Sequence, residues 1–457
     1  MPINKSNLET TVQSQIDGFT CATSPEDMLS AANSAKNLTN DIESHVSLGC
    51  ELPDLNQGKT PVGSMFYVDE LGVPVVAGSQ SWLGIDGRTY RKDIPDTTLY
   101  AWGYNRCGEL GDSTAACRSS PVQEIASTTV WKQVNAGGGT THGIKNDGTL
   151  WGWGCGGTGS IGDGTITTIS SPVQEITSST AWCELSKGGS LSFMTAIKAD
   201  GGLYAWGSGV CGVLANSNVI NISSPVQEIS VSTWIKAANG RCHALGIKTE
   251  GSLWAWGNGS CGKLGNESAA NTSSPIQEIS SSTNWCDVAG AWQNSLGIKT
   301  DGTLWGWGIN FCGNNGDGTS TPRSSPVQEI SSSTNWAQVS AGNYKTNALN
   351  NLGQIFSFGY NANGELGNGI VNFGITPSPS QEFTSSTNWC GVDSGFCHVS
   401  AVKSDGTLWG WGKGDCGAIG DGTTIGRCSP VQELTSAADW YRVSAGVLYT
   451  IALKCTA

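Results

Sequence analysis

Apolar residues return along the chain in a fixed phrase with a period of about fifty residues. Each copy opens with an alternating run of the form Leu, Trp or Tyr, any residue, Trp, Gly. The runs start at Leu99, Leu150, Leu203, Leu253, Leu304, Ile355 and Leu408. Alternation with a period of two predicts a β-strand with one buried face. The spacings of 51, 53, 50, 51, 51 and 53 residues indicate seven copies of one unit.

Further short strands are predicted inside each copy. A polar loop leads to the phrase Ser-Pro-Val-Gln-Glu-Ile or a variant, and a second tryptophan follows. These tryptophans are Trp131, Trp182, Trp234, Trp285, Trp336, Trp389 and Trp440. Asp-Gly or Glu-Gly pairs separate the later strands, and such pairs are typical of tight hairpins.

A repeat of this length, built from short strands, predicts a closed ring of blades or an open solenoid. The chain ends in YTIALKCTA with no following hairpin, and the first copy begins at DTTLYAWG with no preceding strand. Joining these two ends would complete a blade, and no capping repeats of the kind a solenoid needs are present. We therefore predict an all-β fold, a seven-bladed β-propeller over 96–457, closed between the C-terminal strand and the 96–103 strand.

Residues 1–95 do not follow the repeat. The first part is polar, and Ser24 with Pro25 predicts the start of a helix, so we expect a helical arm over 1–50. A helix this weakly apolar is expected to dock on other chains. The residues expected to mediate that assembly are Met28, Leu29, Leu38 and Ile42. Residues 51–95 predict a small β-meander, too short for an independent core.

Composition narrows the possible partners. The 457 residues carry a formal net charge of -13, and only 13% of them are charged. A chain this poor in Lys and Arg is not expected to bind nucleic acid or an anionic membrane. No apolar run is long enough to span a bilayer, and the N-terminus lacks the apolar core of a secretion signal. We therefore expect a soluble chain made in a cytoplasm.

The repeat resembles a known family at two places above all. Trp102–Gly111 and Phe358–Gly367 follow the pattern W/F-G-x-N-x-x-G-E-L-G, and D-G-T-L-W-x-W-G recurs beside it. This pattern is similar to the regulator of chromosome condensation repeat, and the resemblance covers about four fifths of the chain. It implies a propeller. The founding member is a basic nuclear exchange factor for a small GTPase, but the acidic chain offers no match to its functional residues, so that activity is not expected.

A second resemblance concerns the N-terminal part. The segment Leu52–Arg88, with its LPD, FYV, LGVPVVA and WLGIDGR phrases, is similar to small domains near the N-termini of bacteriophage virion proteins. This resemblance implies that the N-terminus attaches to a virion while the propeller projects outward.

No catalytic constellation, cofactor motif or metal site is predicted. His45, His142, His243 and His398 are expected to be structural. The G-D-G-T runs at Gly162–Thr165, Gly316–Thr319 and Gly420–Thr423 have the composition of tight turns and lack the further carboxylates of a calcium loop. An enzyme would need acids and histidines clustered at one end of the channel, and the sequence shows no such cluster.

The sixteen cysteines leave two interpretations open. One class recurs in the loop after the first strand, and a second follows the second tryptophan. They are Cys107, Cys211, Cys261, Cys312 and Cys416 in the first class, and Cys183, Cys286 and Cys390 in the second. Equivalent positions of adjacent blades are expected to lie too far apart to pair. The cysteines, Cys117 and Cys428 included, are either buried thiols or members of disulfides within or between blades.

The sixth copy departs most from the pattern, and Tyr344, Lys345, Tyr360 and Phe373 are its candidate exposed binding residues. The first functional hypothesis is a non-enzymatic virion protein of a tailed phage, a fibre, appendage or decoration protein. It would bind other virion proteins through residues 1–95, assemble as a trimer, and present the propeller to a host-surface glycan or protein. The alternative is a free-standing binding module, a lectin or a protein inhibitor.

Overall fold

The computed structural model describes residues 97–125, 130–188, 192–230, 232–371 and 374–455, together with the backbone of four strands between residues 65 and 90. Contacts divide the chain into two units, Met1–Ile94 and Pro95–Ala457. In the first unit, four strands form an antiparallel sheet in chain order within the segment predicted as a meander. They are β1 (Met65–Val68), β2 (Val73–Ala77), β3 (Trp82–Gly84) and β4 (Thr89–Tyr90). The predicted helical arm, with Met28, Leu29, Leu38 and Ile42, lies outside the described residues.

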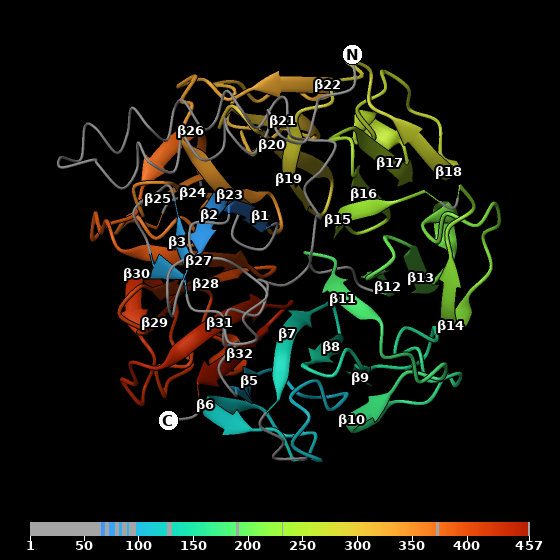
Figure 1. The fold of residues 1–457 in the computed structure, drawn as a ribbon. Coiled ribbons are helices and arrows are strands. Elements are labelled where there is room, and N and C mark those ends of the chain that lie inside the picture. Colours follow the sequence, from blue (N-terminus) through green and yellow to red (C-terminus); the bar gives the residue numbers. More distant parts are fainter. Residues whose placement is uncertain are drawn as a thin grey trace. The chain divides into compact units, whose positions relative to one another are not determined.

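The second unit is a ring of seven four-stranded antiparallel sheets, which confirms the predicted seven-bladed propeller (Figure 1). Blade 1 consists of β31, β32, β5 and β6, and blades 2 to 7 follow in chain order from β7–β10 to β27–β30. The described residues contain three short 3-10 turns, η2 (Val210–Gly212), η3 (Ser260–Gly262) and η4 (Asp415–Gly417), but no α-helix. No helix in this part of the chain could cross a membrane.

Each blade runs outward from the central channel. The innermost strands, from blade 1 to blade 7, are β31 (Trp440–Ala445), β7 (Trp131–Ala136), β11 (Trp182–Leu185), β15 (Trp234–Asn239), β19 (Trp285–Gly290), β23 (Trp336–Ala341) and β27 (Trp389–Ser394). The second strands are β32 (Tyr449–Cys455), β8 (Thr140–Lys145), β12 (Phe193–Lys198), β16 (His243–Lys248), β20 (Asn294–Lys299), β24 (Lys345–Asn350) and β28 (His398–Lys403).

The outer half of each blade holds the repeated Leu-Trp phrase and the Ser-Pro-Val-Gln phrase. The third strands are β5 (Thr97–Gly103), β9 (Leu150–Gly154), β13 (Leu203–Gly207), β17 (Leu253–Gly257), β21 (Leu304–Gly308), β25 (Ile355–Tyr360) and β29 (Leu408–Gly412). The outermost strands are β6 (Arg118–Gln123), β10 (Ile169–Gln174), β14 (Ile222–Gln227), β18 (Thr272–Gln277), β22 (Arg323–Gln328), β26 (Ile375–Gln381) and β30 (Arg427–Gln432).

Blade 1 joins the two ends of the ring. Strand β32 pairs with β5 from Tyr449↔Gly103 to Cys455↔Thr97. Two of this blade's strands, β31 and β32, come from the C-terminal end of the repeat region and the other two, β5 and β6, from its N-terminal end, as the cut in the repeat requires. Closure gives every blade of the ring its full set of four strands. No inner strand is therefore left without a hydrogen-bonded neighbour.

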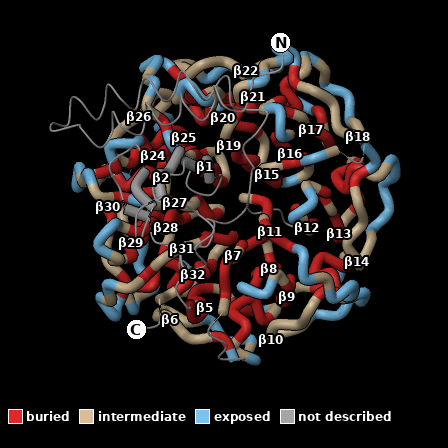
Figure 2. Tube along the Cα trace, viewed as in Figure 1, coloured by how far each residue is buried: buried red, intermediate tan, exposed pale blue. Residues whose placement is uncertain are grey.

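Tryptophan fills the space between blades, and the buried positions concentrate in the strands (Figure 2). In blade 2, Trp131 and Trp153 are fully buried, with ring centroids 5.8 Å apart. The Trp131 indole donates to the Glu124 carboxylate of blade 1. The equivalent pairs are Trp182–Glu175, Trp234–Glu228, Trp285–Glu278, Trp336–Glu329, Trp389–Glu382 and Trp440–Glu433. The repeated glutamate is thus a buried link between successive blades.

Candidate functional site

The described histidines are structural, as predicted. His142, His243 and His398 are buried, and each Nε2 lies 2.8–2.9 Å from an oxygen of Ser160, Ser295 or Thr450. Burial lowers the pKa of His142 to about 4 and the pKa values of His243 and His398 to about 3. All three rings are therefore neutral at neutral pH. His45 lies outside the described residues.

The four binding residues predicted in the sixth copy do not form one exposed surface. The expectation that Lys345 is exposed is wrong, because its side chain is fully buried and its Nζ donates to the carbonyls of Gly395 and Phe396 at 2.9 and 3.2 Å. Burial also lowers the Lys345 pKa. Tyr344 and Tyr360 are half-buried neighbours, joined by a backbone hydrogen bond of 2.9 Å. Phe373 lies outside the described residues.

The described cysteines include both a disulfide and reduced thiols, the two states that the sequence left open. Cys107 and Cys155 form a disulfide between the loops of blades 1 and 2. The second class stays reduced: Cys183 is a buried thiol, and the Cys286 and Cys390 thiols donate to backbone carbonyls at 3.5 and 3.4 Å. Burial raises the pKa of Cys286 to about 12, which makes it a poor nucleophile.

Two groups of polar residues that could hold a metal are already engaged. Ligand atoms of Cys107, Glu109 and Cys155 lie within 4.8 Å of one another, but the two sulfurs are bonded and Glu109 accepts the N–H of Cys107 at 2.8 Å. In the G-D-G-T runs, Asp317 accepts the Thr319 N–H and pairs with Arg323. These carboxylates stabilise turns.

At one end of the central channel, the turns of the blades carry different residues. In six blades, the turn between the innermost and second strands places a residue seven positions after the inner tryptophan. These residues are Gly138, Arg241, Trp292, Asn343, Phe396 and Val447, for blades 2, 4, 5, 6, 7 and 1. This position carries a different residue in every one of the six blades, and the residue that follows it also varies. We call the depression around it the channel mouth.

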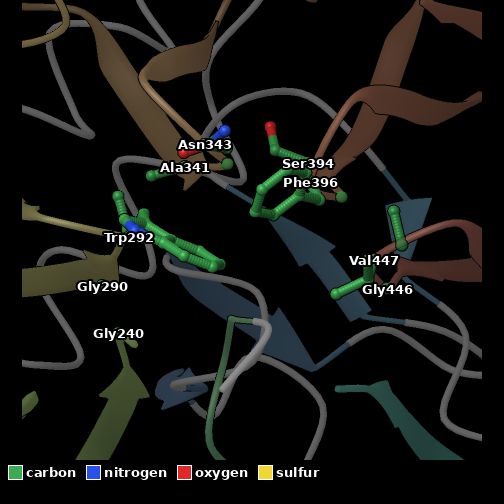
Figure 3. Close-up of a pocket in the computed structure, with 13 residues that line it drawn as sticks. Gly240, Gly290, Trp292, Ala341, Asn343, Ser394, Phe396, Gly446 and Val447 are labelled. Atoms are coloured by element: carbon green, nitrogen blue, oxygen red, sulfur yellow. The ribbon is translucent and has the colours of Figure 1, made fainter. Parts of the chain in front are cut away.

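Two aromatic rings meet over the channel mouth. Trp292 of blade 5 and Phe396 of blade 7 point toward one another, and their centroids lie 4.8 Å apart at 75° (Figure 3). The Arg241 guanidinium lies 4.1 Å from the centroid of the Trp292 ring. Between the two aromatic blades, Asn343 of blade 6 contributes a buried Oδ1 that has no hydrogen-bond partner. Most of the remaining lining is glycine and alanine.

The channel mouth is a small depression. Near it, Lys187 forms an ion pair of 2.5 Å with Asp287 of blade 5. The Lys187 backbone is hydrogen-bonded to Ala237 and Asn239 of β15 in blade 4, so this pair links positions beside two adjacent inner strands. The Trp292–Phe396 contact leaves little space between the rings, and the Arg241 guanidinium lies beside them. Such an arrangement suits binding and offers no group that could act as a nucleophile or base.

Sequence reasoning missed the channel mouth because each copy contributes only one variable residue to it. The sixth copy was chosen because it replaces the strand tryptophan with Phe358 and the acidic turn with Asn-Asn-Leu-Gly, and its candidate Lys345 is buried. The constant offset of seven residues from the inner tryptophan would have shown that Arg241, Trp292 and Phe396 lie at the same end of the channel.

Comparisons with known proteins match the propeller region. A family model described as the RCC1-like domain matches residues 98–452. The ultraviolet-B receptor UVR8 of Arabidopsis thaliana is 32% identical over 146 residues, which cover 32% of this chain and 33% of UVR8. The human E3 ubiquitin-protein ligase HERC2 is 26% identical over 340 residues, which cover 72% of this chain and 7% of HERC2. The chain thus spans a third or less of the length of these curated relatives.

Two solved structures share the fold. Prp20p of Saccharomyces cerevisiae, described with its binding to Gsp1p and histones, superposes with a TM-score of 0.71 at 20% identity, covering 80% of this chain and 93% of Prp20p. Human WBSCR16 gives a TM-score of 0.68 at 21% identity, covering 79% and 99%. At these identities the likeness concerns the fold alone.

Proposed function

Because the chain belongs to the RCC1-like domain family, we propose that it is a non-catalytic protein-binding module whose partner docks on the channel mouth. One observation carries the proposal: the inner turns of blades 4, 5 and 7 bring Arg241, Trp292 and Phe396 together at one end of the channel, with the two aromatic rings 4.8 Å apart. Nothing in the closure of the ring requires this cluster. The description of Prp20p as a binder of Gsp1p and histones supports a protein partner.

The state of the described polar groups supports a non-catalytic role. The three described histidines are buried and neutral, and the repeated glutamates accept hydrogen bonds from tryptophan indoles between blades. The channel mouth itself presents Arg241, Asn343 and apolar side chains, which bind but do not transfer protons at neutral pH. Ligand binding without chemistry is the function that these groups serve best.

A more specific role remains a prediction. A place in a tailed-phage virion, attachment through residues 1–95 and trimer formation rest on a segment of which the structure describes only the backbone of four strands. A host-surface glycan as partner also stays a prediction. The free-standing binding module needs only the propeller, so we favour it.

The proposal is tested by affinity capture with the full chain and two variants. Trp292→Ala combined with Phe396→Ala removes both rings of the channel mouth. Phe311→Ala is the matched control, because Phe311 is 63% exposed in a loop of blade 5 outside the channel mouth. We expect the wild type and the control to retain the same partner and the double variant to lose it, with thermal melting confirming that all three fold. Equal capture by all three proteins would refute the proposal.

A further inference from the structure

A pair of cysteines meets between blades 3 and 4. Cys211 lies in the η2 turn of blade 3, and Cys242 lies directly before β16 of blade 4; both are half-buried thiols outside any disulfide. We propose that these two residues form a thiol–disulfide exchange site, which links the two blades covalently when it reacts with a small disulfide such as oxidised glutathione. The proposal concerns a reaction of the chain itself and does not depend on the partner-binding function proposed above.

The two thiols are already in contact. A hydrogen bond joins the Cys211 and Cys242 side chains. Asn258 touches both residues, because its Nδ2 lies 3.8 Å from the Cys211 Sγ and its backbone N–H donates to the Cys242 carbonyl at 2.7 Å. Thiols that meet across two blades can form a disulfide without a rearrangement of the strands that carry them.

The equivalent junction between blades 1 and 2 holds a disulfide. Cys107 has in blade 1 the position that Cys211 has in blade 3, because each precedes a glycine that lies against the outermost strand of the following blade. Its partner Cys155 follows the third strand of blade 2, and the two Cα atoms are 5.1 Å apart. The space between this loop and the next blade therefore accommodates a disulfide.

In blade 4, a cysteine enters the same space from a neighbouring position. Asn258 takes the place of Cys155 after the third strand, and each donates its backbone N–H to the carbonyl of the residue before the second strand. That residue is Gly139 in blade 2 and Cys242 in blade 4. A Cβ added to Gly139 would lie 3.2 Å from the Cys155 Sγ. A side chain at the position of Cys242 therefore reaches the place that a disulfide sulfur fills in blade 2.

The exchange takes two steps. The Cys211 thiolate attacks one sulfur of oxidised glutathione, forms a mixed disulfide and releases one glutathione thiolate. The Cys242 sulfur then attacks the Cys211 sulfur, its proton passes to the departing second glutathione, and the bond between the blades is complete. The two protein thiols lose two electrons, and one glutathione disulfide gains them to become two thiols.

The surroundings of Cys242 assign the order of these steps. Burial raises the pKa of Cys242, and the positive charges of Lys263 and Arg241 oppose that effect without cancelling it. Cys242 therefore keeps its proton at neutral pH, so we assign the first attack to Cys211. The same two cations favour the Cys242 thiolate in the second step, since neighbouring positive charge stabilises a thiolate.

Mass spectrometry of the full chain tests the proposal. The folded protein is incubated with oxidised glutathione, its remaining thiols are blocked with N-ethylmaleimide, and it is digested with trypsin without reduction. Cleavage after lysine and arginine leaves Cys211 in the peptide 199–236, Cys242 in 242–248 and Cys261 in 249–263, each as the single cysteine. We expect 199–236 and 242–248 as one disulfide-linked species, with loss of the blocked form of 242–248. Dithiothreitol should separate the two peptides.

Cys261→Ser is the matched control. Cys261 has in blade 4 the loop position of Cys211, but Gln293 takes the place of the second cysteine in the following blade. This variant should still yield the linked species, whereas Cys211→Ser should lose it. Recovery of 242–248 mainly in the blocked form, mainly as a glutathione adduct, or linked to 249–263 overturns the proposal.

Discussion

At the scale of single residues, the first position of the second strand shows why side-chain identity alone misled the sequence analysis. Blades 2 to 7 place Thr140, Phe193, His243, Asn294, Lys345 and His398 there, and blade 1 places Tyr449. All seven are buried. In four blades the side chain bonds the next blade, through His243, Lys345, His398 and Tyr449. Lysine is rarely buried, which favoured an exposed Lys345, although the repeat aligns it with His243 and His398.

The buried histidines predict acid sensitivity. Burial lowers the pKa of His243 from 6.5 to about 3. Between these two values the unfolded chain binds a proton that the folded chain does not, so the free energy of unfolding falls as the pH drops below 6.5. The expected loss is about 1.4 kcal/mol per pH unit for this residue. His243→Asn should remove that contribution, and Asn294 shows that blade 5 accommodates the same replacement.

Urea unfolding at several pH values measures this effect. The difference in stability between His243→Asn and the wild type should shift in favour of the variant as the pH falls below 6.5. A difference that does not change with pH would show that His243 does not remain neutral in the folded protein.

At the scale of elements, the loop after the third strand determines how neighbouring blades lock together. The glycine that follows the loop cysteine lies against the outermost strand of the next blade. Gly108 has a φ of +82°, and a Cβ placed on it would lie 2.3 Å from Ser170 Cα. Only glycine fits this contact. The repeated Cys-Gly step is therefore explained by its glycine, and the cysteine beside it is free to vary.

The Cys107–Cys155 disulfide predicts a redox-dependent stability. It closes a sequence separation of 48 residues, and cross-linking a loop of that size stabilises a fold by about 2–4 kcal/mol. Cys107→Ser, or reduction of the wild type with dithiothreitol, should lower the free energy of unfolding by a similar amount and so lower the midpoint of thermal unfolding. Cys312→Ser is the control, since Cys312 holds the equivalent position in blade 5 as a free thiol.

Reduction should have no further effect on Cys107→Ser. A wild type whose melting is insensitive to dithiothreitol would show that the bond contributes nothing to stability, and a Cys312→Ser protein as weak as Cys107→Ser would attribute the effect to serine rather than to the disulfide.

At the scale of the whole molecule, the repeat spacing predicted the class of fold, the number of blades and their sequence limits. These properties follow from positions that recur seven times, such as Trp153 and Trp206, so chance substitutions do not hide them. The channel mouth could not be predicted in the same way, because Trp292 and Phe396 are 104 residues apart in the sequence and meet only when the ring closes. The pairing of Cys107 with Cys155 could not be predicted either, because these residues are 48 positions apart and meet only through the packing of the blades.

Ring closure predicts that stability is shared by all seven blades. Deleting residues 449–457 removes β32 and exposes the edges of β31 and β5. The truncated chain should lose cooperative thermal unfolding throughout the propeller, not in blade 1 alone. Circular dichroism and limited proteolysis measure this, and a synthetic peptide of residues 449–455 added in trans should restore part of the transition. An unchanged transition in the truncated chain would mean that the ring does not need to be closed.

The same pairing has a mechanical consequence. Thr97 and Cys455 are paired with each other at one end of the β5–β32 ladder, so the chain enters and leaves the propeller at the same point. A force that separates those two ends acts across the ladder and loads its residue pairs one after another, beginning with Thr97 and Cys455. Strands pulled in this unzipping direction resist much less than strands sheared along their length. Thermal unfolding has to disrupt the whole ring, whereas a force applied to these two ends opens it at the β5–β32 pairing alone.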